Sequence, residues 1–211
     1  MGRTSDAKTR LIAAMADLVH RRGYVDVGVD DVCRAAGVRK GSFYYFFPSK
    51  RDLMLAALDR QWEMGGAFFG SAFKADLPPL ERIGRLFSIA ARASAHTKAT
   101  KGHVLGCPFG NIAAEVSSTE PALRERADQA FCAIAALVRE ALEDARGRGD
   151  LPANVNLKET ADALLAYFEG LVLLAKTRND PRLIERLGVR AIDLCVASRP
   201  HARPRHLARR K

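Results

Sequence analysis

The chain has 211 residues, 48% of them hydrophobic, which fits one large or two small domains with a proper core and does not favour a disordered chain. Its formal net charge of +10 lies at the two ends: residues 1–60 carry eleven Lys/Arg against seven Asp/Glu, residues 61–198 carry seventeen of each, and residues 199–211 carry six basic residues and no acidic one. A neutral body between basic ends indicates a polyanionic partner at the head. The four cysteines show no CxxC spacing, so in a cytosolic chain they indicate neither a disulfide framework nor a zinc knuckle.

The first predicted helix spans about residues 5–22, where apolar residues recur with helical spacing. Gly23 ends this helix, and we expect its apolar side to cover the back of the two helices that follow. The basic residues Lys8 and Arg10 lie on its exposed side. They either reach DNA phosphates or belong to a solvated face.

Residues 29–47 predict two short helices that are joined by a tight glycine turn. Gly37 follows the last alanine of the first helix, where a left-handed residue commonly closes a helix. In the second helix, from about residue 39 to residue 47, Phe43 and Phe47 share an inward face. The other sides carry basic, hydroxyl and aromatic side chains, which is typical of a helix-turn-helix whose second helix enters a DNA major groove.

A longer helix is predicted to begin after Ser49, a good N-cap residue, with Asp52 placed for a capping box. This helix runs towards Trp62, and we expect it to be the rigid lever between two domains. Three glycines at positions 65, 66 and 70 each weaken it by about 1 kcal/mol relative to alanine. The helix therefore either hinges at the glycines or simply ends or bends there.

The segment from about residue 9 to residue 58 resembles the DNA-binding domain of the TetR family of transcriptional regulators. The resemblance rests on an ordered set of motifs: R-R-G-Y, V-D-D-V, A-A-G-V, K-G-S-F-Y-Y-F-F and P-S-K-R-D-L. Two positions depart from the family's pattern, since Gly28 replaces a usual Ser or Thr and Phe46 replaces a frequent His or Tyr. Our candidates for base-edge or groove contacts are Arg39, Lys40 and Tyr44, and our candidates for phosphate contacts are Ser42, Tyr45 and Lys50.

The remainder of the chain predicts further helices and no strand. They span about residues 80–97, 108–117, 121–146, 157–178 and 181–197, with a loop over residues 96–106. The helix at 157–178 is apolar on two sides and must be buried on both. We therefore expect the last two helices to pair with their copies in a homodimer, as the resemblance also implies.

The predicted fold is all-α, with about nine helices in two domains. Residues 1–55 form a three-helix helix-turn-helix domain, and residues 56–198 form a helical domain for effector sensing and dimerisation. The basic tail, residues 199–211, cannot pack and is expected to be disordered. It either adds nonspecific DNA affinity or is merely solvated.

Cys107 is the candidate sensor residue, because Pro108 suits the first position of a helix and makes Cys107 its N-cap. A thiolate there would meet free backbone N–H groups and the positive end of the helix dipole, which lower its pKa. The alternative is a small, buried and inert capping residue beside a noncovalent pocket. The other cysteines, Cys33, Cys132 and Cys195, lie at core spacings and are expected to be inert.

The pattern GC-x-x-GN-x-x-x-E at residues 106–115 also resembles a TetR subgroup whose sensor domains respond to electrophiles, oxidants or small unsaturated acids. In that subgroup a lysine follows the run E-G-x-x-L-L-A-K, which gives Lys176 here, and the resemblance implies that it stabilises the thiolate. Asn111 and Glu115 share one helix face, where they either orient a ligand or bond to a neighbouring helix.

Aromatic side chains at helical spacing either line an apolar ligand pocket or belong to the core. They are Phe87, Phe109, Phe131, Tyr167 and Phe168, with Trp62 and Phe73 near the junction of the domains.

These features predict a DNA-binding transcriptional regulator, most simply a repressor that a small-molecule inducer releases from double-stranded operator DNA. We expect it in the cytoplasm with no membrane partner, because no apolar run could cross a bilayer and the N-terminus has no signal-peptide segment. We expect no enzyme activity, cofactor or metal, because no HExxH, phosphate loop or dinucleotide fingerprint occurs. A cysteine-dependent enzyme using Cys107 and His103 would lack an orienting third group. An architectural DNA-binding protein would need no large second domain.

Overall fold

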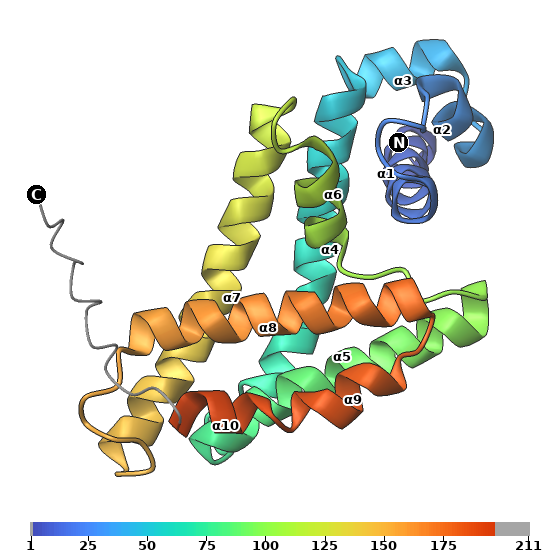
Figure 1. Cartoon of the computed structure of the whole chain (residues 1–211). Coiled ribbons are helices and arrows are strands. Elements are labelled where there is room, and N and C mark those ends of the chain that lie inside the picture. Colours follow the sequence, from blue (N-terminus) through green and yellow to red (C-terminus); the bar gives the residue numbers. More distant parts are fainter. Residues whose placement is uncertain (1, 197–211) are drawn as a thin grey trace, which may run out of the picture.

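The computed structural model describes residues 2–196, and within them the side chains of residues 6–195. Those residues form ten α-helices and no strand, which confirms the predicted all-α fold (Figure 1). The predicted basic tail lies outside the described residues. The helices of the head and of the lever are α1 (Gly2–Arg22), α2 (Val29–Ala36), α3 (Lys40–Phe46) and α4 (Lys50–Ala72). Those of the body are α5 (Pro79–Lys101), α6 (Pro108–Val116), α7 (Pro121–Gly147), α8 (Leu157–Arg178), α9 (Arg182–Gly188) and α10 (Ala191–Val196).

The head is built as its sequence predicts. Gly37 adopts a left-handed conformation, with φ of 62°, and turns the chain between α2 and α3. Leu11 and Met15 of α1 are fully buried against the same core as Phe43 of α3 and Leu53 of α4. This packing fixes α3 to the head through one buried side and leaves its other sides outward.

The lever helix α4 begins as predicted and continues further than predicted. The Ser49 hydroxyl accepts a hydrogen bond from the backbone N–H of Asp52 at 3.2 Å and donates one to its carboxylate at 2.7 Å. The helix runs through the three glycines and ends at Ala72, so it does not end at the glycines, which was one of the predicted alternatives. Phe68 and Phe69 explain the continuity, because they pack against the body core immediately after the first two glycines.

Two other boundaries also differ from prediction. The segment predicted as a loop from residue 96 is helical to Lys101, because α5 is tied to the end of α8: the Lys98 ammonium donates to the carbonyl of Asn179 at 2.6 Å. The last predicted helix is two helices, so the described residues hold ten helices rather than about nine. Gly188, at the end of α9, lies against Phe87 so closely that a Cβ there would be 2.6 Å from the Cβ of Phe87.

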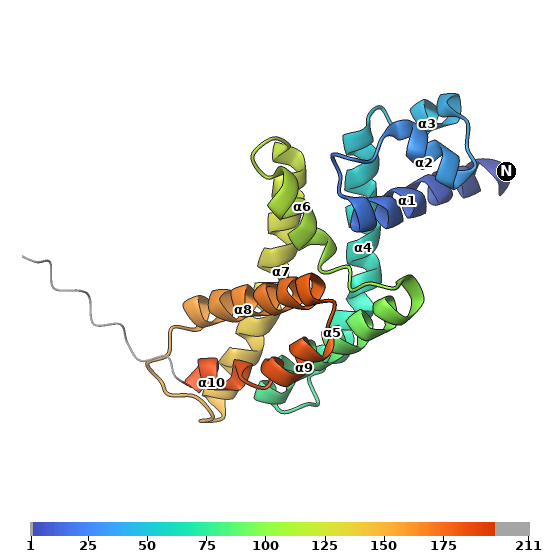
Figure 2. The ribbon, with the colours of Figure 1, turned by 45° about the vertical axis from the view of Figure 1, so that its right-hand side comes forward.

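The core of the head extends into the body through α6. Phe109, Ile112 and Val116 of this helix belong to the same hydrophobic cluster as the buried residues of α1 and α4. Helix α6 also packs on α7, which Figure 2 shows beside the descending α4. A second cluster unites α5, α8, α9 and α10 with the distal half of α7. Within residues 2–196, no helix is long and apolar enough to span a membrane.

Candidate DNA-binding surface and sensor cavity

The outward face of α3 carries the candidate DNA contacts. Tyr45 and Tyr44 are 76% and 53% exposed. Phe43, next to them in the chain, is fully buried on the inward side of the same helix. Arg39 caps the helix and is exposed, as is Lys40, while Ser42 is half-buried. The structure thus brings these five candidates to one short helix, which the buried rings of Phe43 and Phe47 anchor to the core of the head.

Basic candidates in the head already have partners within the chain. The Lys40 ammonium lies 2.9 Å from a carboxylate oxygen of Asp30, at an exposed site. Lys50 donates to the carbonyls of Tyr24 and Val27, at 2.9 and 3.1 Å, and its ammonium lies 4.1 Å from the Tyr24 ring centroid. Lys50 therefore holds the loop between α1 and α2, and a DNA phosphate would have to compete with that loop for it.

The two basic candidates of α1 lie on its exposed side, as the sequence indicates. The Lys8 ammonium lies 5.8 Å from the centroid of the Phe47 ring, and Arg10 pairs with Asp6 at 3.2 Å. Lys8 and Arg10 are themselves exposed, and exposed charged side chains exchange partners at little cost. Neither contact distinguishes the phosphate role from the solvated role.

Cys107 is the N-cap of α6, as predicted from Pro108, and its sulfur accepts a hydrogen bond from the backbone N–H of Gly110 at 3.4 Å. The expected fall in its pKa is nevertheless wrong. Burial, followed by the neighbouring carboxylate of Glu169, raises the pKa of Cys107 far above the usual range and outweighs the helix N-terminus. Cys107 is thus a neutral thiol at neutral pH.

Lys176 contacts the segment near Cys107 but pairs with a different residue. Its ammonium donates to the side-chain oxygen of Asn111 at 2.8 Å, and the amide of Asn111 in turn donates to the carbonyl of Leu105 at 2.9 Å. The implied lysine–thiolate pair is therefore replaced by a lysine–asparagine pair that braces the loop before α6.

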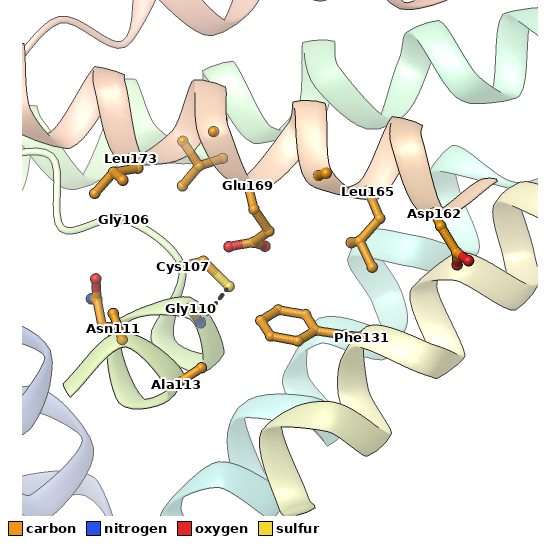
Figure 3. Close-up of a pocket in the computed structure, with 14 residues that line it drawn as sticks. Gly106, Cys107, Gly110, Asn111, Ala113, Phe131, Asp162, Leu165, Glu169 and Leu173 are labelled. Carbon is orange, nitrogen blue, oxygen red and sulfur yellow. Dashed lines mark hydrogen bonds between the residues drawn. The ribbon is translucent and has the colours of Figure 1, made fainter. Parts of the chain in front are cut away.

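Glu169 is the functional candidate that the sequence analysis missed. It projects from α8 towards Cys107 (Figure 3), and Gly110 leaves room for it, since a Cβ on that glycine would lie 2.5 Å from Oε2 of Glu169. Burial raises the pKa of Glu169. The available signal was its position, because it is the acidic residue that interrupts the apolar stretch from residue 163 to residue 175.

A cavity of about 320 Å³, the sensor cavity, lies among α4, α5, α6, α7 and α8. Phe109 and Phe168 line it, as the sequence analysis proposed for them. Its other walls are mostly apolar, with a few polar groups: His20, Gln61, Met64, Gly65, Phe68, Phe69, Ala90, Ala93, Ser94, Thr97, Leu105, Gly106, Cys107, Pro108, Ile134, Glu169 and Val172.

A second hollow of about 440 Å³, which we call the outer groove, lies between α6, α7 and α8 (Figure 3). Asn111 and Phe131 line the outer groove, while Cys107 and Glu169 line both hollows. Tyr167 lines neither of them: its hydroxyl donates to the carbonyl of Leu187 at 2.8 Å.

The remaining aromatic candidates contribute to packing instead of lining the two hollows. Phe87 is buried in the body core against Phe168, with ring centroids 5.5 Å apart. Trp62 stacks edge-on against Phe109, with centroids 6.1 Å apart, at the junction of the domains. Phe73 is half-buried at the end of α4.

Three polar contacts join the head to the body beside these hollows. Glu115 of α6 accepts hydrogen bonds from the backbone N–H groups of Tyr24 and Val25, at 2.7 and 2.8 Å, in the loop between α1 and α2. His20 lies 3.1 Å from the carbonyl of Gly106. Lys101, at the end of α5, pairs with Asp17 of α1 at 2.5 Å. For Glu115, the structure thus selects the bond to a neighbouring segment over a ligand contact.

Known proteins match the chain over both of its parts. Residues 11–57 match the model for bacterial regulatory proteins of the tetR family, and residues 79–190 match that for the tetracyclin repressor-like C-terminal domain. The transcriptional regulator AcuR of Cereibacter sphaeroides is 31% identical over 178 residues, which cover 83% of this chain and 80% of AcuR. The HTH-type transcriptional repressor NemR of Escherichia coli is 28% identical over 177 residues, covering 81% of this chain and 84% of NemR.

A solved structure supports the same conclusion for the fold. The regulatory protein TetR from Rhodobacter sphaeroides shares 27% identity and a TM-score of 0.78 with this chain, and the match covers 90% of this chain and 99% of that one. With one family model matching more than half of the chain and a second matching its helix-turn-helix, this protein belongs to the TetR family of DNA-binding transcriptional regulators.

Proposed function

We propose that this regulator is a homodimeric, cytoplasmic repressor that leaves its operator when a small molecule occupies the sensor cavity. The observation that carries the proposal is the position of α6. At its beginning this helix lines the cavity through Cys107 and Phe109, and at its end it holds the head through Glu115. A helix of 9 residues is short enough to move as one rigid unit.

Entry of a ligand would displace the beginning of α6 and thereby move Glu115 against the loop between α1 and α2. Because Lys50 of α4 holds the same loop from the other side, the head and the lever would reorient together. Two heads would then no longer match the spacing of the operator half-sites. Since both sites act through one equilibrium, inducer and operator must weaken each other's binding by the same factor.

The proposed partner surface for the second copy lies on α8 and the helices after it. Leu173 and Val189 are 60% and 66% exposed, and Leu174 and Leu194 are 39% and 40% exposed. Large apolar side chains that stay exposed on helices packed against each other are typical of an interface between subunits. Homodimers are also typical of the family to which the chain belongs.

The proposal is tested by selecting DNA duplexes from a random pool with the purified protein. We expect a palindrome with two half-sites on one face of the duplex, about one helical turn or more apart. Fluorescence anisotropy on the selected duplex then measures affinity, with a scrambled duplex of equal length as control. If no sequence is enriched, the proposal of a sequence-specific DNA-binding regulator is contradicted. If operator affinity is unchanged when the cavity ligand is saturating, the proposal of ligand-induced release is contradicted.

Covalent modification of Cys107 is a second candidate, favoured by the position of its sulfur in the wall between the sensor cavity and the outer groove. The test repeats the anisotropy measurement after treatment with an α,β-unsaturated aldehyde. Loss of operator binding that a thiol does not reverse, with a mass increase on Cys107, would support this route. Unchanged binding after complete modification of Cys107 would eliminate it.

A further inference from the structure

One carboxylate oxygen in the body, Oε1 of Glu169, is buried and has no hydrogen-bond partner among the described residues. Buried polar atoms nearly always have a partner, because an unpaired one has lost its water without compensation. The carboxylate lies in the wall of the sensor cavity, beside the start of α6. The Cys107 thiol beside the carboxylate is only a weak donor, so the described part of the chain provides no strong donor for Oε1.

The charge of the cavity wall points to the kind of donor that is missing. Of the described residues that line the sensor cavity, none is a lysine or an arginine, and Glu169 is the single acidic one. Burial, with a smaller contribution from the Lys176 and Lys101 charges, lowers the pKa of His20, and burial raises that of Cys107, so both shifts favour the neutral side chain. The Lys176 ammonium is directed to Asn111, which lines the outer groove. A carboxylate in such a wall favours a positively charged group.

We propose that the sensor cavity binds an apolar ligand carrying a positively charged nitrogen, with Glu169 as its counter-ion and hydrogen-bond acceptor. The inference rests on the proposed function, since it names the class of inducer for the same cavity. A volume of about 320 Å³ is at the small end for ligand cavities and suits an arylalkyl amine or a similar small amphiphile. Phe68, Phe109 and Phe168 supply aromatic surface for its apolar part.

The same wall disfavours small unsaturated acids, one of the inducer classes that the sequence motif left open. A small unsaturated acid in this cavity would bring a second carboxylate beside Glu169, and among the described lining residues there is no lysine or arginine to pair with it. Two carboxylates in one buried site repel each other, and one of them must take up a proton. We therefore expect a cationic ligand to bind most tightly, a neutral ligand less tightly and an organic acid most weakly.

The test uses three probes with one carbon skeleton: 4-phenylbutylamine, 4-phenylbutanol and 4-phenylbutyrate. Isothermal titration calorimetry measures their binding to the full chain without DNA. We expect the amine to bind at least tenfold more tightly than the alcohol, and the acid to bind most weakly. Equal binding of amine and alcohol would overturn the inference, because water would then satisfy the carboxylate as well as a ligand does.

Two variants assign the effect to one residue. Glu169→Gln keeps the size of the side chain and removes its charge, so the preference for the amine over the alcohol should disappear. Asp162→Asn is the matched control, because Asp162 lies on the same helix and lines the outer groove but not the sensor cavity. Retention of the amine preference in Glu169→Gln would overturn the inference. If that variant does not fold, the comparison of the three probes on the unmodified protein decides alone.

Operator binding separates this inference from the proposed function. Amine binding that depends on Glu169 but leaves operator affinity unchanged would support the ligand class and contradict ligand-controlled release. Conversely, release of the operator by the alcohol at the same occupancy as by the amine, with no difference in affinity, would support the repressor and overturn the ligand class.

Discussion

The outward face of α3 and the wall between α6 and α8 place their chemically active groups in opposite surroundings. On α3 the exposed tyrosines and basic side chains follow each other within a few residues and point to solvent, while Phe43, with Phe47 at the end of the helix, holds them to the core. In the wall, Cys107 and Glu169 come from distant parts of the chain and are half-buried. The first site depends on local sequence, and the second depends on tertiary contacts.

This difference determines how each site responds to its surroundings. Exposed ions such as Lys40 exchange one partner for another at little cost, which suits a surface that must trade protein contacts for DNA contacts. In the wall, by contrast, burial acts against every charge, so a neutral thiol and a poorly solvated carboxylate result. We therefore expect substitution of the residue that anchors α3 to destabilise the fold, and substitution on the exposed face of α3 to weaken DNA binding. In the wall we expect an altered reactivity of the Cys107 thiol.

The largest effect is expected for Phe43→Ala. Removing this fully buried ring leaves a void between α1, α3 and α4 and should destabilise the protein by about 3–5 kcal/mol. Urea unfolding followed by circular dichroism measures the loss, and operator binding should disappear with it. A stable head with an unchanged denaturation midpoint would show that α3 is not anchored by this residue.

We expect the surroundings of Cys107 to make its thiol slow to react. Since the thiolate is the reactive form and the pKa of Cys107 is raised, its thiolate fraction at pH 7.5 is very small and grows only as the pH rises. Cys132 is exposed, so its predicted place in the core is wrong, and we expect iodoacetamide to label Cys107 at least tenfold more slowly than Cys132, as measured by mass spectrometry of the peptides. Faster labelling of Cys107 would instead favour the covalent sensor.

The same contrast explains what could be predicted from the sequence. The turn at Gly37 and the Ser49–Asp52 cap were predictable, because each depends on residues no more than a few positions away. The N-cap position of Cys107 was predictable from Pro108 next to it, but its pKa was not, because Glu169 of α8 and burial decide it.

Boundaries that depend on distant contacts were missed for the same reason. The last turns of α5 are braced by Asn179 at the end of α8, and the C-terminal end of α9 is pressed against Phe87 of α5. Neither contact can be predicted from the helical periodicity of the sequence. Lys50 shows the same limit within the head: its motif indicates a phosphate contact, whereas in the folded chain it holds two loop carbonyls.

Lys40→Ala should affect function without affecting the fold. We expect operator affinity to fall about tenfold, since a groove contact from a basic side chain contributes on this scale. The unfolding midpoint should stay unchanged, because the ammonium pairs with Asp30 at an exposed site. Anisotropy and urea unfolding on the same sample measure both. A lowered midpoint would place Lys40 with Phe43 among the structural residues.

The smallest effect is expected at the contact that joins the two regions. Glu115→Gln replaces a charged acceptor by a neutral one, so the backbone N–H groups of Tyr24 and Val25 should exchange with deuterium roughly three- to tenfold faster. Glu125→Gln on the exposed side of α7 is the matched control and should leave both rates unchanged. The variant should still bind the operator, but a cavity ligand should release it less completely, because α6 would hold the loop less firmly. If the ligand released the variant as fully as the unmodified protein, the signal would have to travel through Lys101 and Asp17 or through the shared core of α4 and α6 instead.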